Sequence, residues 1–316
     1  MLPIIIKNHI YGIITFSTLS VIILWGIFEH NIIELKASPK SAADDKIINP
    51  NDQHLQLDRF GIKKIYDTKI GGREWYVNMT NPSSDPWFIL GEVALQKQID
   101  GSWRLGGTDI NDQFNDKYHI ILGVNTPPWK EEWRDVEITG YVKIILASED
   151  EDEEEVGLQW YARGANHTNE YPCEGTSLKG RLLIDGNANW KKEIWHDGGY
   201  TDESETEKAT TRSLIDRWFG WKVIIYNTDD TSAVRMESYI DDANNNTWIK
   251  VNDLTDDGGW FASTSDDEFD DAACGFPKNY VLTNSGPVAS FRSDGIVWDF
   301  KNLSVREIQP PTTALD

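Results

Sequence analysis

The sequence predicts an all-β domain built as an antiparallel sandwich or barrel, and two features of its patterning indicate this. Short runs rich in Val, Ile, Tyr and Trp recur between clusters of Gly, Asp and Asn, which is typical of strands and turns. No long segment after residue 55 repeats its apolar residues at helical spacing. Strands that follow one another without helices between them favour antiparallel pairing in two packed layers or a closed barrel.

The expected strands can be read in chain order from their β-branched and aromatic residues, because each run is bounded by turn-forming residues. The segment before them, residues 31–55, is polar, contains Pro39 and Pro50 and shows no periodicity, so it is interpreted as a stalk. Residues 56–309 form the predicted domain and residues 310–316 a flexible tail. The predicted strands cover residues 74–78, 87–95, 118–122, 136–146, 156–163, 178–184, 190–195, 221–227, 234–240, 248–251, 288–292 and 298–308.

Residues 10–28 form an uncharged apolar stretch that predicts one N-terminal transmembrane helix. Its length is close to the roughly 20 residues that a helix needs to cross a bilayer. Lys7 precedes this stretch, whereas Glu29 and Glu34 follow it, so an uncleaved signal anchor would leave the following domain outside the cytoplasm. A cleaved signal peptide and a buried core helix are the alternatives. The resulting prediction is a membrane-anchored protein at the cell surface.

The charge of the chain excludes a general nucleic-acid binder. Its 52 acidic and 30 basic residues give a net charge of -22, and such a surface repels phosphate backbones. The acidic run 149–155 is interpreted as a solvated hairpin tip between two strands. A second acidic stretch, 253–271, contains Asp and Gly in a pattern that could hold Ca²⁺, although it lacks EF-hand spacing.

Two further features agree with an exported domain. Cys173 and Cys274 are the two cysteines of the chain, and an oxidising exterior would permit a disulfide between them, with two unpaired thiols as the alternative. Asn78, Asn166 and Asn245 each begin an N-glycosylation acceptor triplet. The triplets are relevant only to chains exported by organisms with that machinery.

Five consecutive predicted strands, from 156–163 to 234–240, each have one apolar face and one face with long polar or aromatic side chains. If these strands share a sheet, their polar faces join into one cationic and aromatic surface within an acidic chain. Such a surface suits an acidic glycan, because Arg and Lys pair with carboxylates while rings stack on sugars. The residues assigned to it are Gln159, Tyr161, Arg163, Lys179, Arg181, Lys192, His196, Arg235, Glu237 and Tyr239.

The alternative for this surface is an ordinary solvent-facing sheet whose cations pair with the carboxylates of the chain itself. Glu237 shares a face with Arg235 and could pair with it, whereas Glu193 is assigned to the opposite side of its strand from Lys192. Internal pairing is therefore predicted to be incomplete, which favours an external anionic ligand.

The polar rows and the closing strand Ile296-Val-Trp-Asp-Phe-Lys-Asn-Leu-Ser-Val-Arg-Glu-Ile308 resemble the concanavalin A-like lectin/glucanase superfamily. The resemblance covers residues 56–309 and rests on the strand pattern. It implies an antiparallel two-sheet jelly-roll sandwich that binds a glycan on its concave sheet. The superfamily includes lectins, glycoside hydrolases and polysaccharide lyases, so the fold does not decide among them.

A noncatalytic, lectin-like protein that binds a cell-surface or environmental polysaccharide is the leading hypothesis. The Glu-x-Asp-x-Glu strand of the glucanases is absent, as are the Arg-x-Glu-Leu-Arg and Gln-x-His strands of the jelly-roll alginate lyases. A polysaccharide lyase acting on a uronate polymer is the alternative, with His196, Tyr239 and Arg163 as catalytic candidates of suitable chemistry. A structural envelope protein is the second alternative.

Overall fold

The computed structural model describes most of the chain from Leu57 onwards. The predicted membrane span 10–28 and the stalk 31–55 lie outside the described residues. Within the part that is described, no helix is long and apolar enough to cross a bilayer. The described residues are 57–90, 93–105, 119–125, 132–148, 156–165, 171–196, 198–228, 230–271 and 274–311.

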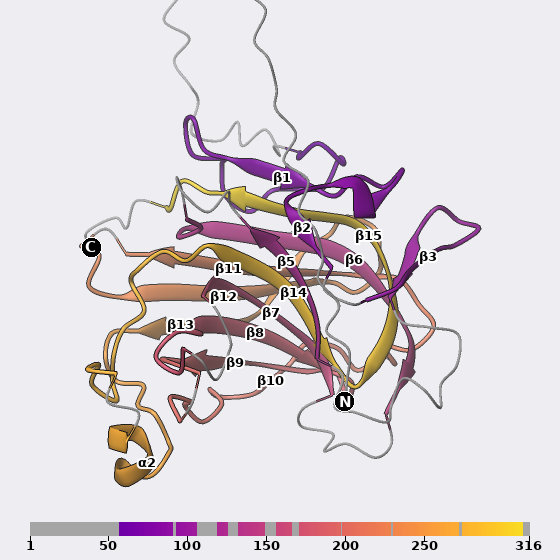
Figure 1. Cartoon of the computed structure of the whole chain (residues 1–316). Helices are drawn as coiled ribbons and strands as arrows, with labels where there is room; N and C mark the ends of the chain where they lie inside the picture. Colours follow the sequence, from indigo (N-terminus) through magenta and orange to yellow (C-terminus); the bar gives the residue numbers. More distant parts are fainter. Residues whose placement is uncertain are drawn as a thin grey trace, which may run out of the picture. The chain divides into compact units, whose positions relative to one another are not determined.

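One sheet has eight antiparallel strands in the order β13-β12-β11-β6-β15-β4-β3, with β1 also paired to β15 (Figure 1). The two 12-residue strands, β6 and β15, lie side by side at its centre. Its strands are β1 (Glu74–Tyr76), β3 (Leu95–Lys97), β4 (Trp103–Leu105), β6 (Val136–Ala147), β11 (Phe219–Asn227), β12 (Val234–Asp241), β13 (Ile249–Asp256) and β15 (Ile296–Glu307).

The other sheet has seven antiparallel strands in the order β10-β9-β8-β7-β14-β5-β2. A single-turn 3-10 helix, η1 (Pro82–Ser84), and a short helix, α2 (Asp266–Asp271), complete the described elements, and α2 lies apart from the sheets (Figure 1). The strands of this sheet are β2 (Phe88–Ile89), β5 (His119–Asn125), β7 (Gly157–Gly164), β8 (Ser177–Leu183), β9 (Asn187–Glu193), β10 (Glu207–Lys208) and β14 (Val288–Asp294).

The inner faces of both sheets contribute to one hydrophobic core. Trp160 and Trp190 of the seven-stranded sheet and Trp221 and Trp298 of the eight-stranded sheet are fully buried in it. Gly180 lies where the sheets approach closely, because a Cβ atom there would come within 2.7 Å of Val223 in β11. The all-β prediction and the two antiparallel sheets are therefore confirmed.

The predicted strands overlap strands of the structure, but several bounds differ, most of all for the run 248–251, which belongs to the longer strand β13 (Ile249–Asp256). Residues 87–95 do not form one strand, because β2 lies within them and β3, in the other sheet, begins at Leu95. Between these two strands the backbone N–H of Val93 donates a hydrogen bond to the carbonyl of Leu90, a contact typical of a turn. The short strands β4 and β10 were not predicted, because two or three residues carry no detectable periodicity.

Part of the outer face of the eight-stranded sheet is covered by residues 57–68, which we call the strap. Phe60, Ile62, Ile65 and Tyr66 of the strap pack with residues of β6, β11 and β12 in a second hydrophobic cluster. The strap is also tied by polar contacts, since Glu137 accepts a hydrogen bond from the backbone N–H of Ile65. The strap and the strands beneath it therefore enclose a second buried cluster, separate from the core between the sheets.

Beneath the strap lies a buried ionic cluster that consists of Glu137, Lys222 and Arg306. The Glu137 carboxylate is 2.6 Å from the Lys222 ammonium and 2.8 Å from the Arg306 guanidinium, and each side chain is 1% exposed. Burial alone would raise the pKa of Glu137, but the two cations outweigh it and hold the pKa at about 2. The ionised carboxylate is therefore part of the folded structure.

We expect acid to destabilise the domain through this carboxylate. The folded-state pKa of Glu137 lies below its ordinary value of 4.5, so its contribution is fully present above about pH 4.5 and is lost as the pH falls towards 2. Denaturant unfolding at a series of pH values measures this loss. The slope of stability against pH between about 4.5 and 2 should be smaller in Glu137→Gln than in the wild type, and an unchanged slope would contradict the assignment.

Candidate functional site

The structure divides the predicted ligand residues between the two sheets. Gln159 and Tyr161 in β7 and Lys179 and Arg181 in β8 lie on neighbouring strands of the seven-stranded sheet. Arg235, Glu237 and Tyr239 lie in β12 of the eight-stranded sheet. The prediction of one joined surface is therefore wrong, because the chain passes from the seven-stranded sheet to the eight-stranded sheet between β10 and β11.

Two of the predicted cations also point elsewhere. Lys192 lies on the inner side of β9, where its ammonium contacts the Asp256 carboxylate at 2.8 Å and the carbonyls of Trp260 and Tyr280. Arg163, near the end of β7, has a positive φ of 62° and a fully buried side chain. Its guanidinium donates to the carbonyls of Arg134 and Leu282, so both cations hold loops in place rather than face a ligand.

The sequence analysis assigned the residues of β9 to the wrong faces of the sheet. β9 pairs with β8 so that Ser177 lies opposite Glu193 and Lys179 opposite Lys191. Residues directly opposite one another share a face, so Lys191 and Glu193 lie on the outer face with Lys179, whereas Lys192 faces the core. A carboxylate that was assigned away from the surface is therefore at its centre.

Glu193 organises one end of the outer face of the seven-stranded sheet. Its carboxylate lies 2.7 Å from the Lys179 ammonium, and it accepts hydrogen bonds from Ser177 at 2.9 Å and from the Tyr200 hydroxyl at 2.5 Å. The His196 Nδ1 atom is 3.5 Å from the same carboxylate. Burial lowers the pKa of Lys179, and the charge of Glu193 opposes this shift. The sequence analysis assigned Glu193 to the other side of its strand and did not single out Tyr200.

Asp294 organises the neighbouring part of this face. Its carboxylate accepts a hydrogen bond from the Gln159 amide at 2.5 Å and contacts the Arg292 guanidinium at 2.9 Å. Burial would lower the pKa of Arg292, but Asp294 outweighs burial and raises it. Tyr161 lies close by, and burial raises the pKa of its hydroxyl. The alternation of Arg292 and Asp294 along β14 is the signal that could have identified them.

A third carboxylate completes the pairing of the cations. Glu203 lies 3.0 Å from Arg181 and 2.9 Å from Lys191. Each of the four cations Lys179, Arg181, Lys191 and Arg292 therefore has a carboxylate partner in the same sheet or its connecting loop. The prediction of incomplete internal pairing is wrong for this face, because Glu193 lies on it.

We call this arrangement the β7–β9 face; it comprises the outer-facing side chains of β7, β8, β9 and β14 together with His196, Tyr200 and Glu203. Its carboxylates Glu193 and Asp294 are buried, which keeps the groups bonded to them in fixed positions. The exposed fraction of the side chain is 14% for Arg292, 20% for Lys191, 27% for His196 and 37% for Glu203. These four side chains, together with Tyr200, are therefore partly exposed.

The catalytic candidates of the lyase hypothesis are not gathered together. Tyr239 donates a hydrogen bond to Glu237 at 2.7 Å on the other sheet, and Arg163 is buried at the end of β7. Only His196 lies on the β7–β9 face. The three residues therefore cannot act on one substrate group.

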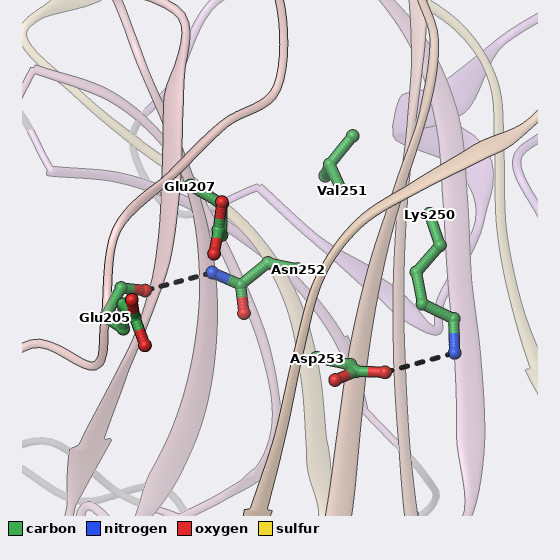
Figure 2. Close-up of a pocket in the computed structure, with 6 residues that line it drawn as sticks. All are labelled: Glu205, Glu207, Lys250, Val251, Asn252 and Asp253. Carbon is green, nitrogen blue, oxygen red and sulfur yellow. Dashed lines mark hydrogen bonds and ion pairs between the residues drawn. The ribbon is translucent and has the colours of Figure 1, made fainter.

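A hollow of about 240 Å³ opens between the edge strands of the two sheets. Glu205 and Glu207 line one side and Lys250 and Asp253 the other, with Asn252 between them (Figure 2). The amide of Asn252 donates a hydrogen bond to the backbone carbonyl of Glu205, which joins the two edges. Three carboxylates with one ammonium make this hollow unsuitable for an acidic glycan, and it contains none of the predicted ligand residues.

Three carboxylates of the acidic stretch proposed for Ca²⁺ form ion pairs with cations of the chain itself. Asp253 contacts Arg235 and Lys250, Asp256 contacts Lys192, and Asp266 contacts Lys278. Among the described residues, no group of three or more His, Cys, Asp or Glu side chains could hold a metal ion. The acidic run 149–155 lies outside the described residues.

The predicted disulfide is confirmed, since Cys173 and Cys274 are joined across a sequence separation of 101 residues. Asn78 and Asn245 are both exposed, and each side chain accepts a hydrogen bond from the backbone N–H two residues on. Asn166 lies outside the described residues. Glycosylation at the three positions stays a prediction.

No family model and no curated protein matches the chain. Solved structures similar to it include peanut lectin, with 8% identity over 76% of this chain and 99% of the lectin, at a TM-score of 0.41. The Ca²⁺-bound exoplasmic/lumenal domain of VIP36 has 11% identity over 74% of this chain and 88% of that domain, at a TM-score of 0.42. An endo-β-1,4-glucuronan lyase from the fungus Trichoderma reesei has 10% identity over 76% of this chain and 99% of the lyase, at a TM-score of 0.41. Lectins and a lyase are among the classes that the resemblance to the concanavalin A-like superfamily implies, but similarities at this level support no conclusion about ligand or reaction in this chain.

Proposed function

We propose that the domain is a noncatalytic glycan-binding module and that the glycan lies across the β7–β9 face. The observation that carries this proposal is the grouping of Lys179, His196 and Tyr200 around the buried carboxylate of Glu193, beside Arg292 on the buried carboxylate of Asp294. Four cations, Lys179, Arg181, Lys191 and Arg292, share this face in a chain whose net charge is -22. Such fixed donors and acceptors suit a ligand rich in hydroxyl and carboxylate groups.

The cations of the β7–β9 face are paired with carboxylates, and this pairing indicates which kind of ligand the face could bind. A guanidinium in contact with a carboxylate keeps further N–H groups, and Arg292 can direct these at a sugar carboxylate without leaving Asp294. The Lys179 ammonium lies 5.1 Å from the centre of the Tyr200 ring, which is close enough for a cation–π interaction between them. We therefore propose a uronate-containing polysaccharide as the preferred ligand and a neutral polysaccharide as a weaker one.

A lyase acting on such a polymer is the second candidate, and one contact favours it. The Glu193 carboxylate beside His196 Nδ1 could orient the ring so that its Nε2 atom accepts a proton. Burial raises the pKa of Tyr161 and so keeps its hydroxyl protonated, which disfavours a lyase that needs the Tyr161 phenolate as its base. Binding without cleavage is therefore the function that the geometry supports best.

The proposed function also includes a location for the protein at the cell surface. We propose that residues 10–28 anchor the chain in a membrane and that the domain lies outside the cytoplasm. The uncharged stretch and the charges on either side of it support this location, as does the disulfide.

Incubation of the full-length protein with acidic and neutral polysaccharides tests the proposed function. We expect retention on a uronate polymer without new ultraviolet absorbance from unsaturated products. New absorbance that disappears in His196→Ala would show a lyase instead. Retention on none of the polymers would overturn both candidates and leave a structural role.

A further inference from the structure

The loop formed by residues 194–201, which follows β9, carries His196 and Tyr200 of the β7–β9 face. One side of this loop is held by the turn that contains Cys173. The backbone N–H of His196 donates a 2.7 Å hydrogen bond to the carbonyl of Glu174, the residue directly after Cys173. The position of His196 is therefore tied to the position of this turn.

The opposite side of the loop is held by residues 262–264. The backbone N–H of Ser263 donates to the carbonyl of Tyr200 at 2.8 Å, and the Thr264 hydroxyl donates to the carbonyl of Gly198 at 2.6 Å. Thr201 and Ala262 also form a β-bridge. Residues 262–264 belong to the long connection between β13 and β14, which also contains Cys274.

The disulfide joins the two segments that hold this loop. Trp195, near the start of the loop, is buried in a small cluster with Phe269, and Cys274 packs against that cluster. The centre of the Trp195 ring is 4.1 Å from that of Phe269 and 6.2 Å from that of Phe276. The loop, the aromatic cluster and the disulfide are therefore in mutual contact.

Both cysteines are partly exposed, so a reductant in solution can reach the bond. A phosphine would supply two electrons to break the S–S bond and would become a phosphine oxide by taking the oxygen atom of one water molecule, whose two protons go to the two thiols. A dithiol would supply both the two electrons and the two protons and would become a disulfide itself. The reduced chain would lose the covalent link between the turn that contains Cys173 and the β13–β14 connection that contains Cys274. The hydrogen bonds that hold His196 and Tyr200 would then depend on two unconnected segments.

The connection between β13 and β14 has a second fastening that does not depend on the disulfide. Lys192 binds the Asp256 carboxylate and the carbonyls of Trp260 and Tyr280, which lie on both sides of residues 262–274. The main core between the sheets contains neither cysteine. Reduction should therefore loosen the loop locally and leave the sandwich folded.

We infer that the Cys173–Cys274 disulfide is a positioning element for the glycan site, acting through His196 and Tyr200, and that the redox state of this pair sets the affinity. The inference rests on the proposed function for its effect on binding. Its effect on the loop itself can be observed without any ligand.

The experiment compares the oxidised protein with the protein reduced by a phosphine and alkylated, both as the full chain and both shown to be folded by circular dichroism. Affinity for a uronate polymer should fall about ten-fold on reduction, as expected for losing one well-placed charged hydrogen bond. A Cys173→Ser/Cys274→Ser variant should bind like the reduced protein and should not respond to the reductant.

The Tyr200→Phe variant distinguishes positioning from general weakening. If the disulfide acts through Tyr200, reduction should cost this variant much less affinity than it costs the wild type, because the two changes are coupled. Equal losses in both proteins would overturn a role through Tyr200, and unchanged affinity of the reduced wild type would overturn the inference as a whole.

The imidazole resonances of His196 give a readout that needs no glycan. They should shift on reduction, with assignment by loss of the signal in His196→Gln, while signals from the main core stay in place. If the oxidised protein binds no polysaccharide but the His196 signal shifts, the proposed function fails and the positioning of the loop by the disulfide stands. An unmoved His196 signal would contradict the positioning role directly.

Discussion

Glu137→Gln should lower the free energy of unfolding by about 3–5 kcal/mol, the range for breaking a buried ion pair by removing one partner. The substitution removes the charge that faces Lys222 at 2.6 Å and Arg306 at 2.8 Å, and neither cation can reach solvent because both are 1% exposed. It also weakens the acceptor for the backbone N–H of Ile65, which fastens the strap. Denaturant unfolding followed by tryptophan fluorescence measures the change.

Asp253→Asn is the matched control for this prediction. Asp253 also contacts two cations of the same sheet, Arg235 and Lys250, but its side chain is 36% exposed. Exposed pairs contribute about 0.2–1 kcal/mol, so this variant should remain close to the wild type. Losses of similar size in both variants would show that the strap does not shield the Glu137 cluster from water.

Much of the fold could be predicted from the sequence because strand periodicity is a local property. The runs 136–146, 221–227 and 234–240 agree with β6, β11 and β12 to within two residues at either end. The disulfide could be predicted because the chain has only two cysteines. These features depend on residue types and near neighbours rather than on how distant segments meet.

The site could be predicted only in part because it depends on which strands share a sheet. Lys222, Arg235 and Tyr239 alternate with apolar residues as Lys179 and Arg181 do, but they belong to the other sheet. Sequence periodicity could not show that the strap covers their face. The predicted faces of β9 were also reversed, because successive residues of a strand point to opposite faces. The prediction therefore placed Lys192 on the outer face, where the structure has Glu193.

Arg292→Ala should weaken binding of a uronate polymer by about 1–3 kcal/mol, roughly 5- to 150-fold, the cost of losing a hydrogen bond to a charged group. Arg292 lies in β14 on the β7–β9 face, and its guanidinium is fixed by Asp294. The variant also leaves Asp294 with the Gln159 amide as a partner, so the carboxylate keeps one hydrogen bond. The loss should shrink as salt is added, because salt screens the attraction in the wild type.

Arg235→Ala provides the matched comparison, because Arg235 is also a strand arginine paired with a carboxylate, but in the other sheet. Isothermal titration of both variants with the same uronate oligosaccharide tests most directly whether the β7–β9 face is the ligand surface. We expect the affinity to fall in Arg292→Ala and to stay at the wild-type value in Arg235→Ala, with both proteins folded. A loss confined to Arg235→Ala, or equal affinities in all three proteins, would contradict binding on the β7–β9 face.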